Sequence, residues 1–76
     1  MQISVTRDGS VFFRDRHVLR SELAREIRKG VRNGAEKKVY LIVDARATYG
    51  AAMQVLNQIR LAGIEKVSFL TEQPSQ

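Results

Sequence analysis

The amino-acid sequence predicts one small α+β domain of order β-β-α-β-α-β, with a mixed sheet and two helices packed on one face of it. Three patterns support this: an opening hairpin, two helical stripes of apolar residues, and a strand–helix–strand order in the second half. A parallel pair of strands needs a crossover connection, so the last pattern fixes the local architecture. We assign residues 1–71 to the domain and residues 72–76 to a flexible polar tail.

The opening residues alternate between apolar and polar, with Ile3 and Val5 on one face, which is typical of a half-buried strand. Asp8-Gly9 then suits a tight hairpin turn, because glycine accepts a positive φ without steric cost. The return strand covers residues 10–14. We interpret Asp15–His17 as a second turn.

A first helix follows, for which Ser21 is the expected N-cap. Leu23, Ile27 and Val31 recur every four residues and define one apolar helix face. Asn33-Gly34 is the expected C-terminal stop.

The second half opens with the apolar run Val39–Val43. Such a run fits a central strand covered on both faces, or one covered by helices on one face and by a partner on the other. Asp44 ends this strand, Thr48 is placed to cap the next helix, and Gly63 is placed to end it. Residues 66–70 form the last strand. The expected buried stripe of the second helix is Ala52, Val55, Leu56 and Ile59.

Size and composition limit what this chain can be. A domain of 76 residues buries only about 60% of its unfolded surface, so its stability is marginal. Without cysteine it forms no disulfide, and with one histidine it offers no typical zinc site, so we expect at least a homodimer. No apolar run is long enough for a membrane span or a secretory signal. The chain is therefore either cytosolic or part of something larger.

The net charge is +5, and most Lys and Arg residues lie between Arg7 and Lys38. This bias favours an anionic partner, although interspersed acidic residues also fit a solvated helix face. The rival function is thus a small cytosolic nucleic-acid-binding module. Phe12 and Phe13 are adjacent and point to opposite faces, so at most one of them could stack on a base.

The sequence contains no recognisable catalytic constellation. His17 is the only imidazole and is expected at the surface, and no nucleotide-binding or metalloprotease motif occurs. Glu22 and Glu26 lie one helical turn apart beside basic residues, which fits a solvated face. We expect a protein that is not an enzyme and has no cofactor and no metal.

Asp44, Arg46 and Tyr49 form the candidate partner-binding loop. Asp44 lies at the carboxyl end of the best strand, the edge where ligands usually bind in α/β units. Two interpretations of Asp44 stay open, because its carboxylate either orders the loop or contacts a partner directly. The ring of Tyr49 is placed to cover the helix start while its hydroxyl reaches solvent.

The chain resembles the soluble domain of the ExbD/TolR biopolymer-transport family nearly end to end. The features that carry the resemblance are the hairpin VTRDGSVFF, the helix with Leu23 and Ile27, the segments LIVDARATYG and VLNQIRLAG, and the strand KVSFLTE. The most specific are the spacing from Asp44 to Tyr49-Gly50 and the helix end Arg60-Leu61-Ala62-Gly63. Each motif is weak alone, but their order and spacing are distinctive.

The resemblance implies a periplasmic domain of a single-pass inner-membrane protein in a motor driven by the proton motive force. Its implied partners are a second copy, an ExbB- or TolQ-like membrane protein, a TonB- or TolA-like energy transducer and, in the TolR branch, the cell wall; nucleic acid is not expected. The membrane helix with its proton-responsive aspartate is missing here, and Asp44 is not that residue. Peptidoglycan binding through the positive charge, and strand addition at an open sheet edge, are the two contacts we expect.

Overall fold

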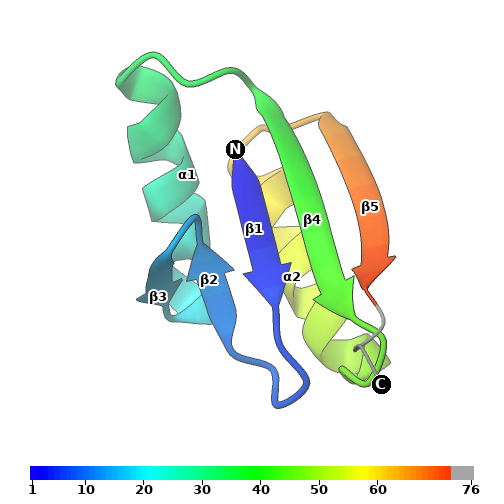
Figure 1. Cartoon of the computed structure of the whole chain (residues 1–76). Helices are drawn as coiled ribbons and strands as arrows, with labels where there is room; N and C mark the ends of the chain where they lie inside the picture. The colour runs from blue at the N-terminus through cyan, green and yellow to red at the C-terminus, as the bar shows by residue number, and fades with distance from the viewer. Residues whose placement is uncertain (73–76) are drawn as a thin grey trace.

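The computed structural model describes residues 1–72, which form one five-stranded sheet with both helices on the same face (Figure 1). The sheet order is β3-β2-β1-β4-β5. This confirms the predicted α+β class and the two helices on one side of a mixed sheet. The strands are β1 (Gln2–Val5), β2 (Val11–Phe13), β3 (Arg16–Val18), β4 (Lys38–Asp44) and β5 (Lys66–Glu72), and the helices are α1 (Leu23–Arg32) and α2 (Tyr49–Leu61).

Two parallel pairings join the halves of the sheet. β1 pairs with β4 in the register Ile3 to Leu41, and β4 pairs with β5 in the register Leu41 to Phe69. The connection from β1 to β4 contains α1, and the connection from β4 to β5 contains α2. The second connection has the predicted strand–helix–strand order. β2 and β3 extend the other side of the sheet as an antiparallel meander.

The core lies between the sheet and the helix layer. On α1 the predicted stripe is confirmed, with Leu23 and Ile27 fully buried and Val31 packed against them. On α2, Val55 and Ile59 are fully buried, whereas Leu56 is only partly buried. The sheet contributes alternate residues of its strands: Ile3, Val5, Val11, Phe13, Val39, Leu41 and Val43.

The second helix begins and ends where the sequence predicts. The Thr48 hydroxyl accepts a hydrogen bond from the backbone N–H of Ala51 at 3.2 Å, which satisfies one of the N–H groups left unpaired at a helix start. Gly63 has a φ of +87° directly after the helix, a conformation that costs glycine little. Gly34, with a φ of +100°, ends the first helix in the same way.

Three local predictions need correction. Asp15–His17 is not simply a turn, because the chain reverses at Arg14, whose φ is +59°, and Arg16–Val18 pairs with β2 as β3. Ser21 does not cap α1; it lies in a 3-10 turn, Arg20–Glu22, that leads into the helix without a side-chain cap. The last strand continues past Leu70 to Glu72, and the rest of the predicted tail, residues 73–76, lies outside the described residues.

The apolar run Val39–Val43 resolves into an alternating strand. Val39, Leu41 and Val43 face the helices, while Tyr40 is 42% exposed and Ile42 half-buried on the opposite side. No helix of the described residues covers that opposite side of the sheet, which we call the open face (Figure 1). Of the two predicted arrangements, coverage of both faces of the strand is therefore wrong for residues 1–72.

The burial of Leu41 on β4 predicts that two leucine-to-alanine substitutions differ greatly in their effect on the free energy of unfolding. Leu41→Ala removes a fully buried side chain and should lower the unfolding free energy by about 2–5 kcal/mol. Leu61→Ala is the matched control, because Leu61 is 68% exposed at the end of α2, and should change it by less than about 0.5 kcal/mol. Urea denaturation measures both, and equal effects would contradict the assigned core.

Candidate interaction surfaces

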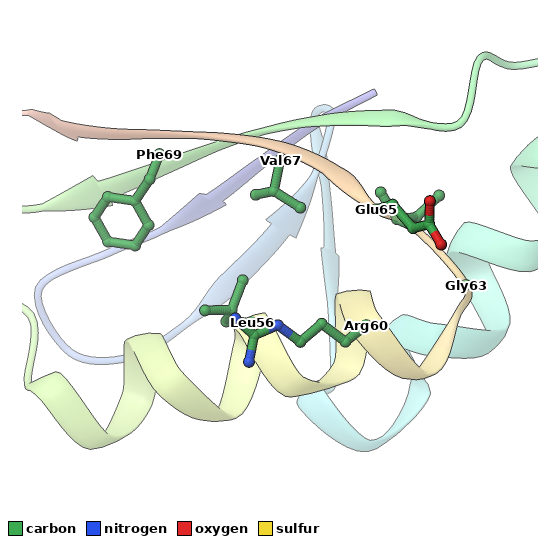
Figure 2. A pocket seen from close by; sticks show the side chains of 7 residues that line it. Leu56, Arg60, Gly63, Glu65, Val67 and Phe69 are labelled. Carbon is green, nitrogen blue, oxygen red and sulfur yellow. The ribbon is translucent and has the colours of Figure 1, made fainter.

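An apolar groove lies between α2 and β5. Figure 2 shows Leu56 on the helix and Val67 and Phe69 on the strand, with the two elements facing one another across the groove. The groove has a volume of about 610 Å³, and Phe69 remains 51% exposed in it. Arg60 and Glu65 contribute opposite charges to its lining. An apolar depression with a few polar groups is a common form of binding surface.

The groove lies beside the outer edge of β5, which is the last strand in the sheet order. The carbonyl of Glu72 accepts a hydrogen bond from the N–H of Ala45 at 2.9 Å, so the backbone groups of Glu72 point toward β4. Backbone direction alternates along a strand, so Val67, Phe69 and Thr71 direct their N–H and C=O groups outward. Within the described residues this edge has no neighbouring strand and is a template for one.

The predicted loop site is held together by Asp44 and Arg46. The guanidinium of Arg46 donates Nε and Nη2 hydrogen bonds to the two carboxylate oxygens of Asp44, both at 3.0 Å. The backbone N–H of Arg46 adds a third bond to the same carboxylate at 2.8 Å. This bidentate geometry is the strong form of an ion pair. Of the two interpretations of Asp44, the structure therefore supports the ordering of the loop, and partner contact stays a prediction.

These contacts also set the ionisation of Asp44. The hydrogen bonds from the side chain and then the backbone of Arg46 lower its pKa from the usual 3.8 to about 2, with a small further effect of the Arg7 charge. Hydrogen bonds to the charged form favour that form. The carboxylate is consequently ionised at every physiological pH.

Tyr49 is the first residue of α2 and is 80% exposed, so its ring covers little of the helix start. The structure thus joins Asp44 and Arg46 in one contact and places Tyr49 separately, at the end of the same loop. An exposed tyrosine next to an ordered loop suits a contact surface, because its ring buries apolar area while its hydroxyl keeps a polar partner.

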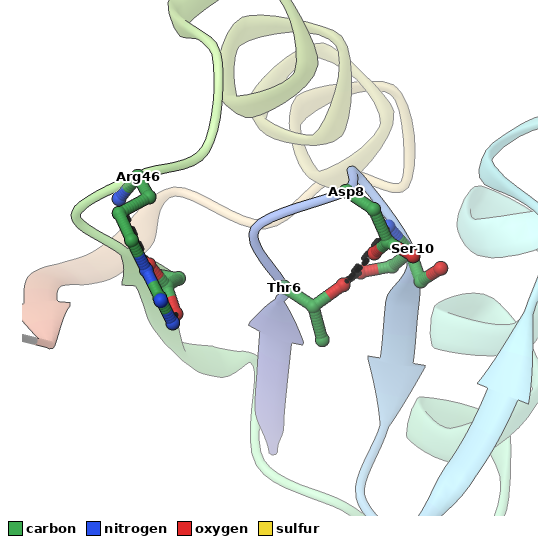
Figure 3. A network of polar contacts seen from close by, with 5 residues as sticks. Thr6, Asp8, Ser10 and Arg46 are labelled. Atoms are coloured by element: carbon green, nitrogen blue, oxygen red, sulfur yellow. Dashed lines mark hydrogen bonds and ion pairs between the residues drawn. The ribbon is translucent and has the colours of Figure 1, made fainter. Parts of the chain in front are cut away.

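The β1–β2 turn lies next to this loop (Figure 3). The Thr6 hydroxyl donates to the carboxylate of Asp8, and the N–H of Ser10 is shared between both side chains at 3.2 and 3.3 Å. These bonds, led by the one from Thr6, lower the pKa of Asp8. Thr6, Asp8, Asp44, Arg46 and also Arg7 line a shallow polar depression of about 380 Å³.

The basic first half of the chain is partly neutralised by ion pairs. Arg25 pairs with Glu22 at 2.7 Å, and Arg16 pairs with Glu26. The Glu22 side chain is 42% exposed, which fits the predicted solvated helix face, whereas the Glu26 side chain is only 14% exposed where it pairs with Arg16 of β3. Among residues 1–72, no three acidic or histidine side chains gather where they could hold a metal ion.

Sequence comparison identifies the family. The family model described as "Biopolymer transport protein ExbD/TolR" matches residues 1–74, nearly the whole chain. The chain belongs to the ExbD/TolR family. A search of curated proteins gave no significant match. Membership of the ExbD/TolR family implies a role in an energy-transducing complex for biopolymer transport, as the resemblance of the sequence had indicated.

Family members work with ExbB/TolQ- and TonB/TolA-type partners, and membership implies an inner-membrane-anchored periplasmic domain. Within residues 1–72, neither helix has the length and apolar character needed to span a bilayer.

The sequence had pointed to the loop and to an open edge, but not to the groove. The sequence predicts Leu56 in the buried stripe of α2 and a last strand over residues 66–70, which includes Phe69, and both predictions are compatible with a closed core. Only their positions opposite one another, at the margin of the sheet, create the depression. The one signal that could have revealed it is the surplus of apolar residues on a terminal strand.

The Asp44–Arg46 contact predicts a specific titration. The carboxyl carbon of Asp44, followed by NMR, should titrate near pH 2, and Arg46→Gln should raise that pKa toward 3.8. Arg7→Gln is the matched control for charge, and it should raise the pKa much less, because Arg7 acts only at a distance. Equal shifts in the two variants would show that the hydrogen bonds do not set this pKa.

The same contact gives a pH dependence of stability. Because the folded-state pKa of Asp44 is depressed, its contribution to stability is complete above the unfolded value near 3.8 and is lost as the pH falls toward 2. Asp44→Asn should therefore reduce the decline of unfolding free energy between about pH 4 and pH 2. Chemical denaturation at several pH values measures this, and an unchanged slope would contradict it.

Proposed function

We propose that the chain is the periplasmic docking and coupling domain of an inner-membrane motor driven by the proton motive force, and that it is not an enzyme. Such a motor, of the ExbB-ExbD-TonB or TolQ-TolR-TolA type, energises outer-membrane transport or integrity. The observation that carries the proposal is the outward-facing edge of β5 beside an apolar groove, in a chain of the ExbD/TolR family. A free strand edge beside an apolar groove is a common form of peptide-binding surface.

The docking step is strand addition to β5. An extended segment of a TonB- or TolA-like transducer pairs with the outward N–H and C=O groups of Val67, Phe69 and Thr71. Side chains on one side of the added strand then reach the groove, where Phe69 and Leu56 offer apolar contact. The opposite charges of Arg60 and Glu65 at the margin of the groove favour a segment with complementary charges. Backbone pairing supplies affinity and the alternating side chains supply specificity.

Coupling to the proton motive force uses the membrane helix of the family and an ExbB- or TolQ-like partner, and not the residues of this domain. An ExbB- or TolQ-like protein is engaged through the membrane helix that the resemblance implies, and the proton-responsive aspartate belongs to that helix. The low pKa of Asp44 supports this division, because a carboxyl group that is ionised at all physiological pH values does not take up and release protons there. Asp44 and Arg46 hold the contact loop together at one end of the sheet, and Tyr49 exposes its ring at the end of the same loop.

An NMR titration tests the proposal. Labelled protein receives a TonB-type segment, a TolA-type segment or a short oligonucleotide at near-physiological salt. We expect amide shifts along β5 and around Asp44–Tyr49 with one of the two protein segments. Shifts with the oligonucleotide alone, over α1 and the connector to β4, would instead support the nucleic-acid-binding alternative.

A proline substitution isolates the strand-addition step. Phe69→Pro removes the aromatic ring and one outward N–H, whereas the matched control Phe69→Ala removes only the ring. Proline is tolerated on an edge strand when its missing N–H faces away from the sheet, so both variants should fold. Phe69→Pro should bind the segment about fivefold or more weakly than Phe69→Ala, in line with the loss of one backbone hydrogen bond. Equal affinities, with both variants folded, would exclude pairing at this position.

Peptidoglycan is a further proposed partner, supported by the net charge of +5 and by the exposed basic residues of α1. The domain should sediment with purified sacculi at low salt and be released as salt rises, because exposed charges are screened. Lys29→Glu with Arg32→Glu should weaken sedimentation, and complete absence of the unmodified domain from the pellet would remove this partner.

A further inference from the structure

The open face of β4 and β5 has an ordered arrangement of charge that follows from the register of the two strands. Lys38 lies opposite Lys66 at one end, and Asp44 lies opposite Glu72 at the other. Like charges directly opposite one another on a sheet are destabilising. Here two such pairs occur, of opposite sign, at the two ends of the same pair of strands. The two ends are six positions apart along each strand, which is about 20 Å at the usual rise of a strand.

The middle of this surface is apolar. Tyr40 lies opposite Ser68, and Ile42 lies opposite Leu70 on the same side. Tyr40 is 42% exposed and Leu70 53% exposed, so two large apolar side chains face solvent near one another. Phe12 on β2 extends the apolar area across Ser4, its neighbour in register. An apolar centre between charged ends is the layout of an interface, with a core and a polar rim.

We propose that the open face binds the open face of a second copy of this chain, with the strands of the two copies running in opposite directions. The two-fold axis crosses the strands at the level of Leu41 and Phe69. Lys38 and Asp44 are equally far from Leu41 along β4, and Lys66 and Glu72 are equally far from Phe69 along β5. The rotation therefore places each lysine pair over the acidic pair of the other copy.

The same rotation brings the apolar centres together. It places Tyr40 of one copy over Ile42 of its partner, and Ile42 over Tyr40, because these residues flank Leu41. Two sheets packed in this way lie about 10 Å apart and form a sandwich whose strands are nearly aligned. A surface that is complementary to itself under a two-fold rotation is what an isologous dimer requires.

The energetic roles of the two parts differ. The apolar centre supplies most of the affinity, and the charged ends set direction and register, because rim charges contribute more to specificity than to affinity. Asp44 is already paired with Arg46, so the ion pairs that fix the orientation are those between Lys66 of one copy and Glu72 of the other. Two such pairs form in each dimer, one at either end.

This inference rests on the homodimer that the resemblance to the ExbD/TolR family implies, and it names the surface that forms it. The face is distinct from the outer edge of β5, so failure of the face-to-face dimer leaves strand addition intact. Conversely, a transducer segment that does not bind at β5 leaves the dimer test unaffected. The two proposals therefore fail separately.

A charge exchange tests the proposal, with association measured by sedimentation equilibrium over a wide range of protein concentration. Lys66→Glu places like charges at both ends of its own dimer, and Glu72→Lys does the same with the opposite sign. Each variant alone should be monomeric at concentrations where the unmodified protein dimerises. An equimolar mixture of the two should associate again, because each end then joins one acidic and one basic side chain.

Controls separate this surface from others. Lys29→Glu makes the same change of charge on α1, in the helix layer, and should dimerise like the unmodified protein. Leu70→Ser removes an exposed apolar side chain and should weaken the dimer while changing the stability of the monomer little. Dimers that persist in both charge variants, or a mixture that stays monomeric although both parents are folded, would overturn the proposal. A protein that is monomeric throughout would overturn the dimeric state as well.

Discussion

The fold depends on the way in which the side chains of β4 alternate between the two faces of the sheet. This strand pairs in parallel with β1 and with β5, so both crossovers and both helices are positioned by it. Val39, Leu41 and Val43 turn toward the helices and leave almost no exposed surface. Because side chains alternate along a strand, the same geometry forces Tyr40 and Ile42 to the other side. Both crossovers run in the same direction along the sheet, from β1 to β4 and from β4 to β5, so both helices of the described residues lie on one face. The apolar central strand therefore leaves an apolar open face.

This constraint also explains why the surfaces of the molecule are features of the sheet and not of a pocket. The sheet is finite, so β5 has an outer edge, and α2 is too narrow to cover it fully, so Leu56 and Phe69 remain accessible between them. The loop after β4 is held in a different way, because Arg46 forms a bidentate ion pair with the carboxylate at the end of the strand. The result is three contact areas on the surface of the described residues: the groove beside β5, the loop after β4 and the open face of the sheet.

The structural features that depend on local residue patterns could be predicted from the sequence. The two helices, their glycine stops, the Thr48 cap and the strand–helix–strand order are each determined within a few residues of chain. β3 escaped prediction because three residues with a single buried valine carry no usable period, and its turn depends on a positive φ at Arg14 that nothing in the residue type signals. The missing cap at Ser21 reflects a 3-10 turn that places Ser21 before the helix start.

The candidate site was also predictable only in part: its residues could be chosen from the sequence, but their contacts could not. Asp44, Arg46 and Tyr49 could be chosen from sequence because they follow a strand and precede a helix, but the sequence did not show that two of them bind each other while the third stays apart. The groove and the charge pairs required the register of β4 against β5, which links residues 28 positions apart, such as Lys38 and Lys66. No local pattern contains that register, because it is set by the length of the α2 crossover and by the packing of its buried face.

The register also determines how the two proposed contacts combine. A two-fold axis that crosses the strands keeps each β5 over the β5 of the partner copy, so both outer edges lie on the same side of the dimer and run in opposite directions. The two grooves then lie on the outer surfaces, since each is on the helix side of its own sheet. Face-to-face pairing thus leaves both edges open to strand addition. A transducer segment that adds to one edge in a given direction meets the second edge reversed, so one dimer offers two equivalent sites of opposite polarity.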